Sequence, residues 1–209
     1  MYFDKKDILG LDKIDRINLI NSITGIKPVL LVGTRSLENG TNLAIFSSVV
    51  HISSNPSRLG FFVRTNKAIR RDTLDNIIEN NVFTFNHINL SLLKRAHNTS
   101  IKFEKSVSEF DRCKFTEEYI DGFFAPFVKE SNIKIGMSLK EIVNMASTES
   151  KLIIGEVDYM IFEQDFLEKD FTLNLEKTNS IAVSGLNHYY ENKKCMTLPY
   201  ARLNNMFKI

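Results

Sequence analysis

Apolar and polar residues alternate along two segments in the second half of the chain. In IKIGMSLK (133–140) every second residue is apolar, and the same period recurs in 152–162 around Val157, Tyr159 and Ile161. A period of two is typical of half-buried strands. The polar residues between the two segments, 147–151, predict the turn of a hairpin.

Further strands are predicted in the first half of the chain. The apolar, β-branched run VLLVGTR (29–35) suits a strand covered on both faces. The turn Glu38-Asn39-Gly40-Thr41 then leads into a second arm, from Asn42 through Phe46 toward Val50. LGFFVR (59–64) predicts a third strand after an Asn55-Pro56 break, and 82–88 a fourth, with Phe83, Phe85 and His87 on one face.

Three helices are predicted before and between these strands. Asp12 can cap a helix with isoleucines at 14, 17, 20 and 23, and Gly25 can end it. Asp72 and Thr73 can cap a helix with Leu74, Ile77 and Ile78 on one face. A short helix is expected near 91–97, and loops with small helices from there through Phe127.

The order of these elements indicates a fold that is mainly β with helices. Long helices between successive strands are lacking, so an antiparallel, Greek-key-like barrel fits better than a doubly wound parallel sheet. We predict one domain over 1–209, with an N-terminal helical segment (1–25) and a C-terminal extension (180–209).

Composition supports a globular chain without a strong charge bias. The 209 residues are 43% hydrophobic, with 16 Phe and no Trp, and carry a net charge of +2. The chain shows no signal-peptide core and no membrane-spanning run, so we expect a cytoplasmic protein that binds neither membrane nor nucleic acid. Cys113 and Cys195 are far apart, which favours incidental reduced thiols over a disulfide or zinc site.

Several catalytic and nucleotide-binding motifs are missing from the sequence. It contains no GxG pair, no P-loop, no HExxH and no GxSxG, and its histidines (51, 87, 97 and 188) lack metal-ligand spacing. A Rossmann domain, a P-loop and a metal site are therefore not expected.

Three polar segments remain as candidate binding sites. Serines lie within apolar strand sequence over 42–56, where a flat aromatic ligand could rest, although spacing alone favours an ordinary serine-rich hairpin. Arg70-Arg71-Asp72-Thr73 stands at a predicted helix start and could bind phosphate, or could be a solvated surface pair. The polar run 96–102 could be a site or a simple helix exit.

In their order and spacing, these segments resemble the flavin reductase-like family of FMN-binding split barrels. The resemblance covers about residues 25–202. It rests on NLAIFSSVVHISSNPSRLGFFVR, RRDTLDNIIENNVFTFNHI, AHNTSIKF followed by VSEFD, APFVKESNIKIG, LIIGEVDYMI, SGLNHYY and LPYAR.

The resemblance implies a split β-barrel homodimer with FMN near the subunit interface. The flavin ring would be bordered by Phe46, Ser47, Ser48, Ser53, Ser54 and Asn55. The phosphate would meet Arg64, Arg71 and Thr73, and the site would be closed by Thr99 and Ser100. His87 and His97 would lie near the cofactor, and Tyr189, Tyr200 and Arg202 would approach from the C-terminal segment or the partner chain. His87 could instead be a buried structural imidazole, and the tyrosines could serve packing.

The implied activity is hydride transfer from NADH or NADPH to FMN, with no catalytic acid or base from the protein because the flavin carries the chemistry. The alternative is an FMN-binding electron carrier or flavin holder without turnover. A basic nucleic-acid binder centred on 64–71 is disfavoured by the low net charge and by the lack of an aromatic RNA-binding pattern. The sequence identifies no partner oxygenase.

Overall fold

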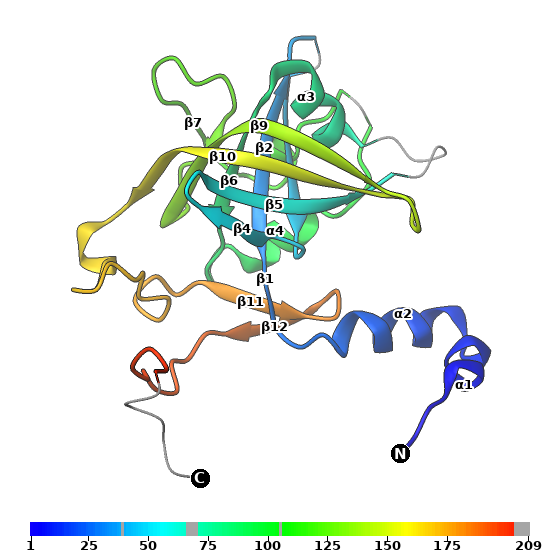
Figure 1. Ribbon diagram of the computed structural model, residues 1–209. Helices are drawn as coiled ribbons and strands as arrows, with labels where there is room; N and C mark the ends of the chain where they lie inside the picture. Colours follow the sequence, from blue (N-terminus) through cyan, green and yellow to red (C-terminus); the bar gives the residue numbers. More distant parts are fainter. Residues whose placement is uncertain (39, 66–70, 105, 203–209) are drawn as a thin grey trace.

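The computed structural model describes residues 1–38, 40–65, 71–104 and 106–202 (Figure 1). Its helices are α1 Lys5–Gly10, α2 Lys13–Ser22, α3 Asp72–Asn80, α4 Leu93–Asn98 and α5 Glu109–Arg112, with a 3-10 turn, η1, at Gln164–Phe166. Its strands are β1 Lys27–Pro28, β2 Leu30–Ser36, β3 Gly40–Phe46, β4 Val50–Ser54, β5 Ser57–Arg64, β6 Val82–His87, β7 Glu117–Glu118, β8 Phe127–Val128, β9 Ile133–Met145, β10 Ser150–Phe162, β11 Ile181–Ser184 and β12 His188–Glu191.

Seven strands form one antiparallel sheet that curves into a split barrel. Their order is β3-β2-β6-β9-β10-β5-β4, and every pairing in this sheet is antiparallel. The short link from Phe46 to Val50 joins the two edge strands, β3 and β4. The predicted mainly β, antiparallel barrel is confirmed.

Aromatic rings fill the interior of this barrel. Phe61, Phe83 and Phe85 are fully buried, and their ring centroids lie 5.3–5.6 Å apart. Tilted and edge-to-face pairs at such distances add about 0.5–1.5 kcal/mol each to the free energy of burial. The period-two pattern of 82–88 therefore places Phe83 and Phe85 inside, as predicted.

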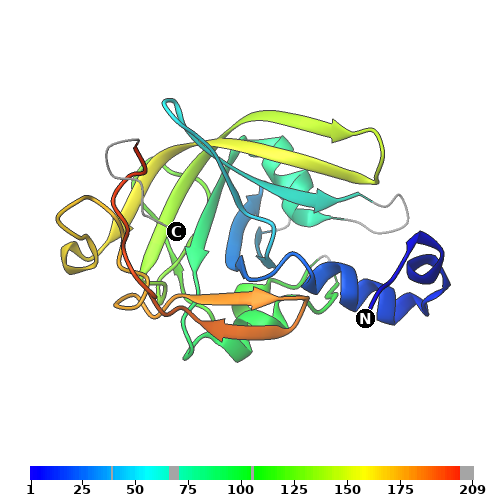
Figure 2. The same cartoon turned by 60° about the horizontal axis from the view of Figure 1, so that its bottom comes forward.

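A second core lies on the outer face of β2 and β3. Leu31 and Leu43 pack there against α4, α5 and β11, while their chain neighbours Leu30 and Val32 face the barrel interior. This arrangement explains why β2 reads as a continuous apolar run, because both of its faces are covered. Figure 2 shows the β11–β12 hairpin lying beneath the barrel.

The predicted strands are found at the expected positions in the sequence, but their lengths differ in places. β9 and β10 each span 13 residues, longer than their predicted counterparts, and pair along almost their whole length. The arm predicted from Asn42 toward Val50 ends at Phe46, because the chain there leaves β3 and crosses to β4. The turn residue Asn39 lies outside the described residues.

The predicted helix caps are wrong in detail. Asp12 is the N-cap of α2 but makes no cap hydrogen bond, and the N-cap of α3 is Arg71, so Asp72 and Thr73 lie inside the first turn. Ile78 is 49% exposed and does not share the buried face of Leu74. That face is completed instead by polar side chains, because α3 covers a polar end of β2 and β3.

The C-terminal segment contributes to the folded core. β11 pairs with both β1 and β12, and Ile181, Ala182 and Val183 are all buried. Cys113 is buried, Cys195 is exposed, and neither forms a disulfide. In the described part of the chain, no helix is both long and apolar enough to cross a bilayer.

The N-terminal arm, defined here as residues 1–26, contrasts with the barrel. It contains α2 and also α1, a separate helix within the predicted helical segment 1–25, at whose start Asp4 and Asp7 form a capping box. Neither helix contains a buried residue, and both extend away from the barrel (Figures 1 and 2). Ile14 and Ile23 are 64% and 72% exposed.

Candidate functional site

The first candidate group lies where β3 ends beside β5. The Phe46 ring contacts the Phe61 ring edge-to-face at 4.9 Å. Ser48 Oγ donates to the carbonyl of Phe62 and accepts from its amide, both at 3.1 Å. The Ser48 side chain therefore connects the β3–β4 link to β5. The hydroxyl of its neighbour Ser47 makes no hydrogen bond within the described chain.

A second group forms the tip of the β4–β5 hairpin. Ser53 Oγ accepts from the Asn55 amide at 3.2 Å, and Ser54 Oγ lies 3.2 Å from Nε2 of His51. From this tip β5 runs about 20 Å to Arg64, at about 3.3 Å per residue. A single ligand that touched the tip and Arg64 of one chain would therefore have to lie extended along the hairpin.

A third group stands at the start of α3. Arg71 Nε donates to the carbonyl of Arg64 at 3.0 Å, so the Arg71 guanidinium lies against the backbone of Arg64. Neither guanidinium forms an ion pair with an acid of the described residues. Arg70 lies outside those residues. The pair supplies positive charge beside the free amides of a helix start.

Thr73 belongs to a network of buried polar side chains that we call the α3 cluster: Thr34, Asn42, Thr73 and Asn76. Asn42 Nδ2 donates to both threonine hydroxyls at 3.1 Å, and Asn76 Nδ2 donates to Thr34 Oγ1 at 3.1 Å. The network joins α3 to β2 and β3. Thr73 Oγ1 accepts one hydrogen bond, from Asn42, so its hydroxyl hydrogen and one lone pair are left for a ligand.

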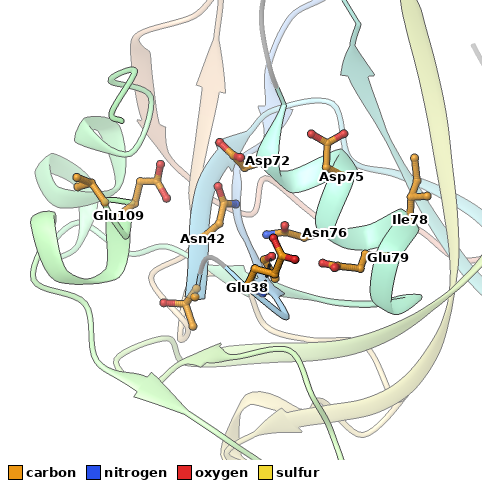
Figure 3. Close-up of a pocket in the computed structure, with 12 residues that line it drawn as sticks. Glu38, Asn42, Asp72, Asp75, Asn76, Ile78, Glu79 and Glu109 are labelled. Atoms are coloured by element: carbon orange, nitrogen blue, oxygen red, sulfur yellow. Dashed lines mark hydrogen bonds between the residues drawn. The ribbon is translucent and has the colours of Figure 1, made fainter. Parts of the chain in front are cut away.

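Carboxylates surround the outer side of the α3 cluster. A hollow of about 380 Å³ lies there, and its lining includes Glu38, Asp72, Asp75, Glu79 and Glu109. Figure 3 shows Asp72, Asp75 and Glu79 projecting from α3 on one side of Asn42, and Glu109 on the other. Such a surface repels anions, so any phosphate near α3 must approach from the side of the two arginines.

His87 is the last residue of β6. It forms what we call the histidine cluster together with Thr178 and Ser180. The imidazole Nδ1 lies 3.0 Å from Ser180 Oγ, which lies 2.8 Å from Thr178 Oγ1. Burial lowers the pKa of His87 to about 4, because the charged ring would lose its hydration. The ring is therefore neutral at pH 7. Ser180 also borders a second hollow, of about 530 Å³.

His97 and the residues after it form the last group, at the end of α4. The His97 ring lies edge-to-face with Tyr189, and Nδ1 is 2.7 Å from the phenol oxygen. Thr99 and Ser100 donate their hydroxyls to the carbonyls of Ala96 and His97. These hydroxyls close the helix end, whereas the Tyr200 and Arg202 side chains are exposed.

The sheet register relates two of these groups. Leu30 pairs with Phe46 on one side and with His87 on the other. Directly paired residues project to the same face, so Phe46 and His87 share a face about 10 Å apart, two strand spacings. In the described part of the chain, no hydrogen bond or ring contact joins the hairpin tip or the His97 group to Phe46 or His87.

Sequence reasoning missed the residues that hold the candidates in place. Asn42 reaches Thr73 from 31 positions away, and Ser180 reaches His87 from 93 positions away. Only the fold brings such pairs together. A signal existed for Asn42, since a polar residue predicted on a buried strand face needs a buried partner.

The chain matches known proteins along most of its length. The model of the flavin reductase like domain matches residues 26–181. The uncharacterized protein YwrF of Bacillus subtilis (strain 168) is 24% identical over 198 residues, which are 90% of this chain and 94% of YwrF.

Two solved structures extend the comparison. A candidate flavin reductase with a split barrel domain from Shewanella frigidimarina NCIMB 400 is 36% identical, with a TM-score of 0.91, over 96% of this chain and all of that one. Nitrilotriacetate monooxygenase component B from Bacillus cereus is 22% identical, with a TM-score of 0.83, over 95% and 98% of the two chains. The second likeness is one of fold.

Proposed function

Because the chain belongs to the flavin reductase-like family, we propose that it binds FMN and takes the electrons for it from NADH or NADPH. The observation that carries this proposal is the family match over residues 26–181, which spans the whole seven-stranded barrel. The 36% identity to the Shewanella protein over nearly the full chain supports it.

The donor set of the chain fits FMN. A phosphate needs cationic donors, and Arg64 and Arg71 offer guanidinium groups without an acid partner among the described residues. A flat ring needs an apolar surface with polar groups at its edge, and Phe46 with Ser47 offers both at the end of β3. The carboxylates around α3 oppose a phosphate, so we expect the phosphate to be held with moderate strength.

In this proposal the residues bind and orient, and none transfers a proton. Bound FMN would supply the hydride chemistry. The reciprocal bonds of Ser48 to Phe62 fix the β3–β4 link against which the ring would rest. The hydrogen bond between His97 and Tyr189 joins α4 to β12.

A steady-state assay tests the reductase part of the proposal. Purified protein is mixed with NADH or NADPH and free FMN in air, so that oxygen is the only final electron acceptor. Oxidation of the nicotinamide is then followed. We expect turnover that saturates with FMN. Tight FMN binding with no oxidation of either nicotinamide would contradict a reductase and leave an electron carrier or flavin holder.

We also propose a homodimer. The N-terminal arm carries Ile14, Ile20 and Ile23 on its surface, at 64%, 47% and 72% exposure, and no residue of the arm's helices is buried by its own barrel. Apolar side chains at this density are expected to be covered by another surface. Sedimentation equilibrium should give twice the mass of 24.0 kDa, and a monomer at micromolar concentration would contradict the proposal.

The setting of the reaction is part of the same proposal. Both cysteines are free, which suits a reducing compartment such as the cytoplasm. Reduced flavin needs a consumer, and the Bacillus cereus structure is named as a monooxygenase component. We propose on this ground that a second protein, such as an oxygenase, accepts the reduced flavin.

A further inference from the structure

His87 is fixed at three points in the fold. Its backbone pairs with Leu30 in β2, and its carbonyl accepts from Ser131 Oγ at 2.8 Å. Its ring meets Ser180 through Nδ1 at 3.0 Å. No residue of the described chain forms a hydrogen bond with the other ring nitrogen, Nε2.

The hydrogen bonds around Ser180 have a single consistent direction. Thr178 Oγ1 lies 3.0 Å from the carbonyl of Leu175, which can only accept, so Thr178 donates its one hydroxyl hydrogen there. In the 2.8 Å contact between the two hydroxyls, Ser180 must then be the donor. Its own hydrogen is now used, so Ser180 Oγ accepts from His87 Nδ1, and Nδ1 carries the ring hydrogen.

We propose that Ser180 and Thr178 are positioning residues that hold His87 as the Nδ1–H tautomer and present its bare Nε2 as a hydrogen-bond acceptor to the flavin. The flavin part rests on the proposed function. The tautomer part stands on the hydrogen bonds of the chain alone.

The surroundings of the Thr178 and Ser180 hydroxyls keep their hydrogen bonds in place. Thr178 is 1% exposed and Ser180 is 4% exposed, so water does not compete for either one. The Thr178 carbonyl accepts from Asn132 Nδ2 at 3.0 Å, and the Ser180 carbonyl accepts from Asn192 Nδ2 at 2.8 Å. Reversing the bonds would leave the Leu175 carbonyl with the Ser180 amide, at 3.3 Å, as its donor, and would cost one part-buried hydrogen bond.

An acceptor at this position complements the rest of the candidate site. His87 shares its sheet face with Phe46, which we place beside the flavin ring. An oxidised flavin ring carries one N–H donor among its several acceptors. A histidine locked with Nε2 bare can pair with such a donor, whereas the opposite tautomer would place two hydrogens against each other.

The variant Thr178→Val separates this role from packing. Valine keeps the branched shape but removes the acceptor, so the Ser180 hydrogen is free to turn toward Nδ1 of His87. Thr178→Ser keeps the hydroxyl and is the matched control. Two-bond ¹H–¹⁵N NMR of the flavin-free protein, read at His87, should report Nδ1–H in the wild type and in T178S, and Nε2–H in T178V. An Nε2–H ring in the wild type would overturn the inference.

Flavin titration of the same three proteins tests the ligand part. T178V should bind FMN and riboflavin about two- to tenfold more weakly, by equal factors, since the lost hydrogen bond is to the ring. T178S should bind like the wild type. If T178V has the reversed tautomer but unchanged flavin affinity, the acceptor role of His87 is overturned and FMN binding stands. If none of the three proteins binds flavin, both the acceptor role and FMN binding are overturned.

Discussion

The α3 cluster and the histidine cluster are both built from buried polar side chains, yet they leave different atoms for a ligand. In the α3 cluster, Asn42 donates to both threonines and Asn76 to Thr34, and what remains outside is the positive charge of the neighbouring arginines. In the histidine cluster, a one-way chain of hydroxyls ends on Nδ1 and leaves Nε2 as a bare acceptor.

This difference matches the two ends of a flavin nucleotide. One end of FMN is an anionic phosphate, which needs cations and donors, and the other end is a ring with an N–H edge, which needs an acceptor. The α3 end also carries a cost that the histidine end lacks, because five carboxylates line the hollow beside it. The ring should therefore contribute a larger share of the affinity than the phosphate.

The largest expected effect concerns the histidine cluster and pH. Burial holds the pKa of His87 at about 4, below its ordinary value of 6.5, so between these values the unfolded chain binds the proton more readily. Stability from the neutral His87 ring is therefore fully present above pH 6.5. As the pH falls toward 4, the free energy of unfolding drops by about 3 kcal/mol. Urea unfolding at several pH values measures this loss.

The variant His87→Gln isolates that contribution, because glutamine does not titrate. Its unfolding free energy should fall less steeply between pH 6.5 and 4 than that of the wild type, while the slopes of both proteins agree above pH 7. Equal slopes in the acid range would show that His87 does not carry a depressed pKa, and would remove the contrast between the two clusters.

The next effect concerns the cations at the α3 end. Arg71→Ala removes a guanidinium from the proposed phosphate site and should weaken FMN binding by about 1–3 kcal/mol. Riboflavin lacks the phosphate, so its affinity should barely change. Arg112→Ala removes an exposed cation on α5 and serves as the control. Equal losses of FMN and riboflavin affinity in Arg71→Ala would place the phosphate elsewhere.

The smallest effect concerns the carboxylates. Asp75 is exposed in the first turn of α3, and Asp75→Asn should tighten FMN by about two- to fivefold at low salt through reduced repulsion. The gain should shrink at high salt, since exposed charges are screened. Asp121→Asn, an exposed change elsewhere, should have no effect in the same fluorescence titration. A tighter riboflavin complex would argue against a charge effect.

The sequence predicts the barrel well because strand periodicity is a local property. The alternation in 133–140 and 152–162 predicts the β9–β10 hairpin, and the run at 29–35 predicts a strand covered on both faces. The short strands β1, β7 and β8 carry only two residues each and depend on their partners. β11 was placed in an extension, although the apolar run Ile181–Val183 could have indicated a buried strand.

The candidate site is less predictable for a physical reason. Arg71 and Thr73 could be picked out because they stand at a helix start, a local feature. Ser180 and Thr178 could not, because their roles depend on hydrogen bonds to β6 across more than 90 positions of sequence. Side-chain orientation could not be predicted either: Ser48 was expected at the flavin ring, but its hydroxyl is hydrogen-bonded to the backbone of Phe62.

The central claim is that this split barrel binds FMN and accepts electrons for it from a nicotinamide. The most direct measurement is the visible absorption spectrum of the protein after incubation with FMN and gel filtration, followed by anaerobic addition of NADH and then NADPH. We expect flavin bands that elute with the protein and bleach with at least one nicotinamide. A protein that elutes colourless and oxidises neither nicotinamide with added FMN, or whose flavin bands persist with both nicotinamides, would contradict it.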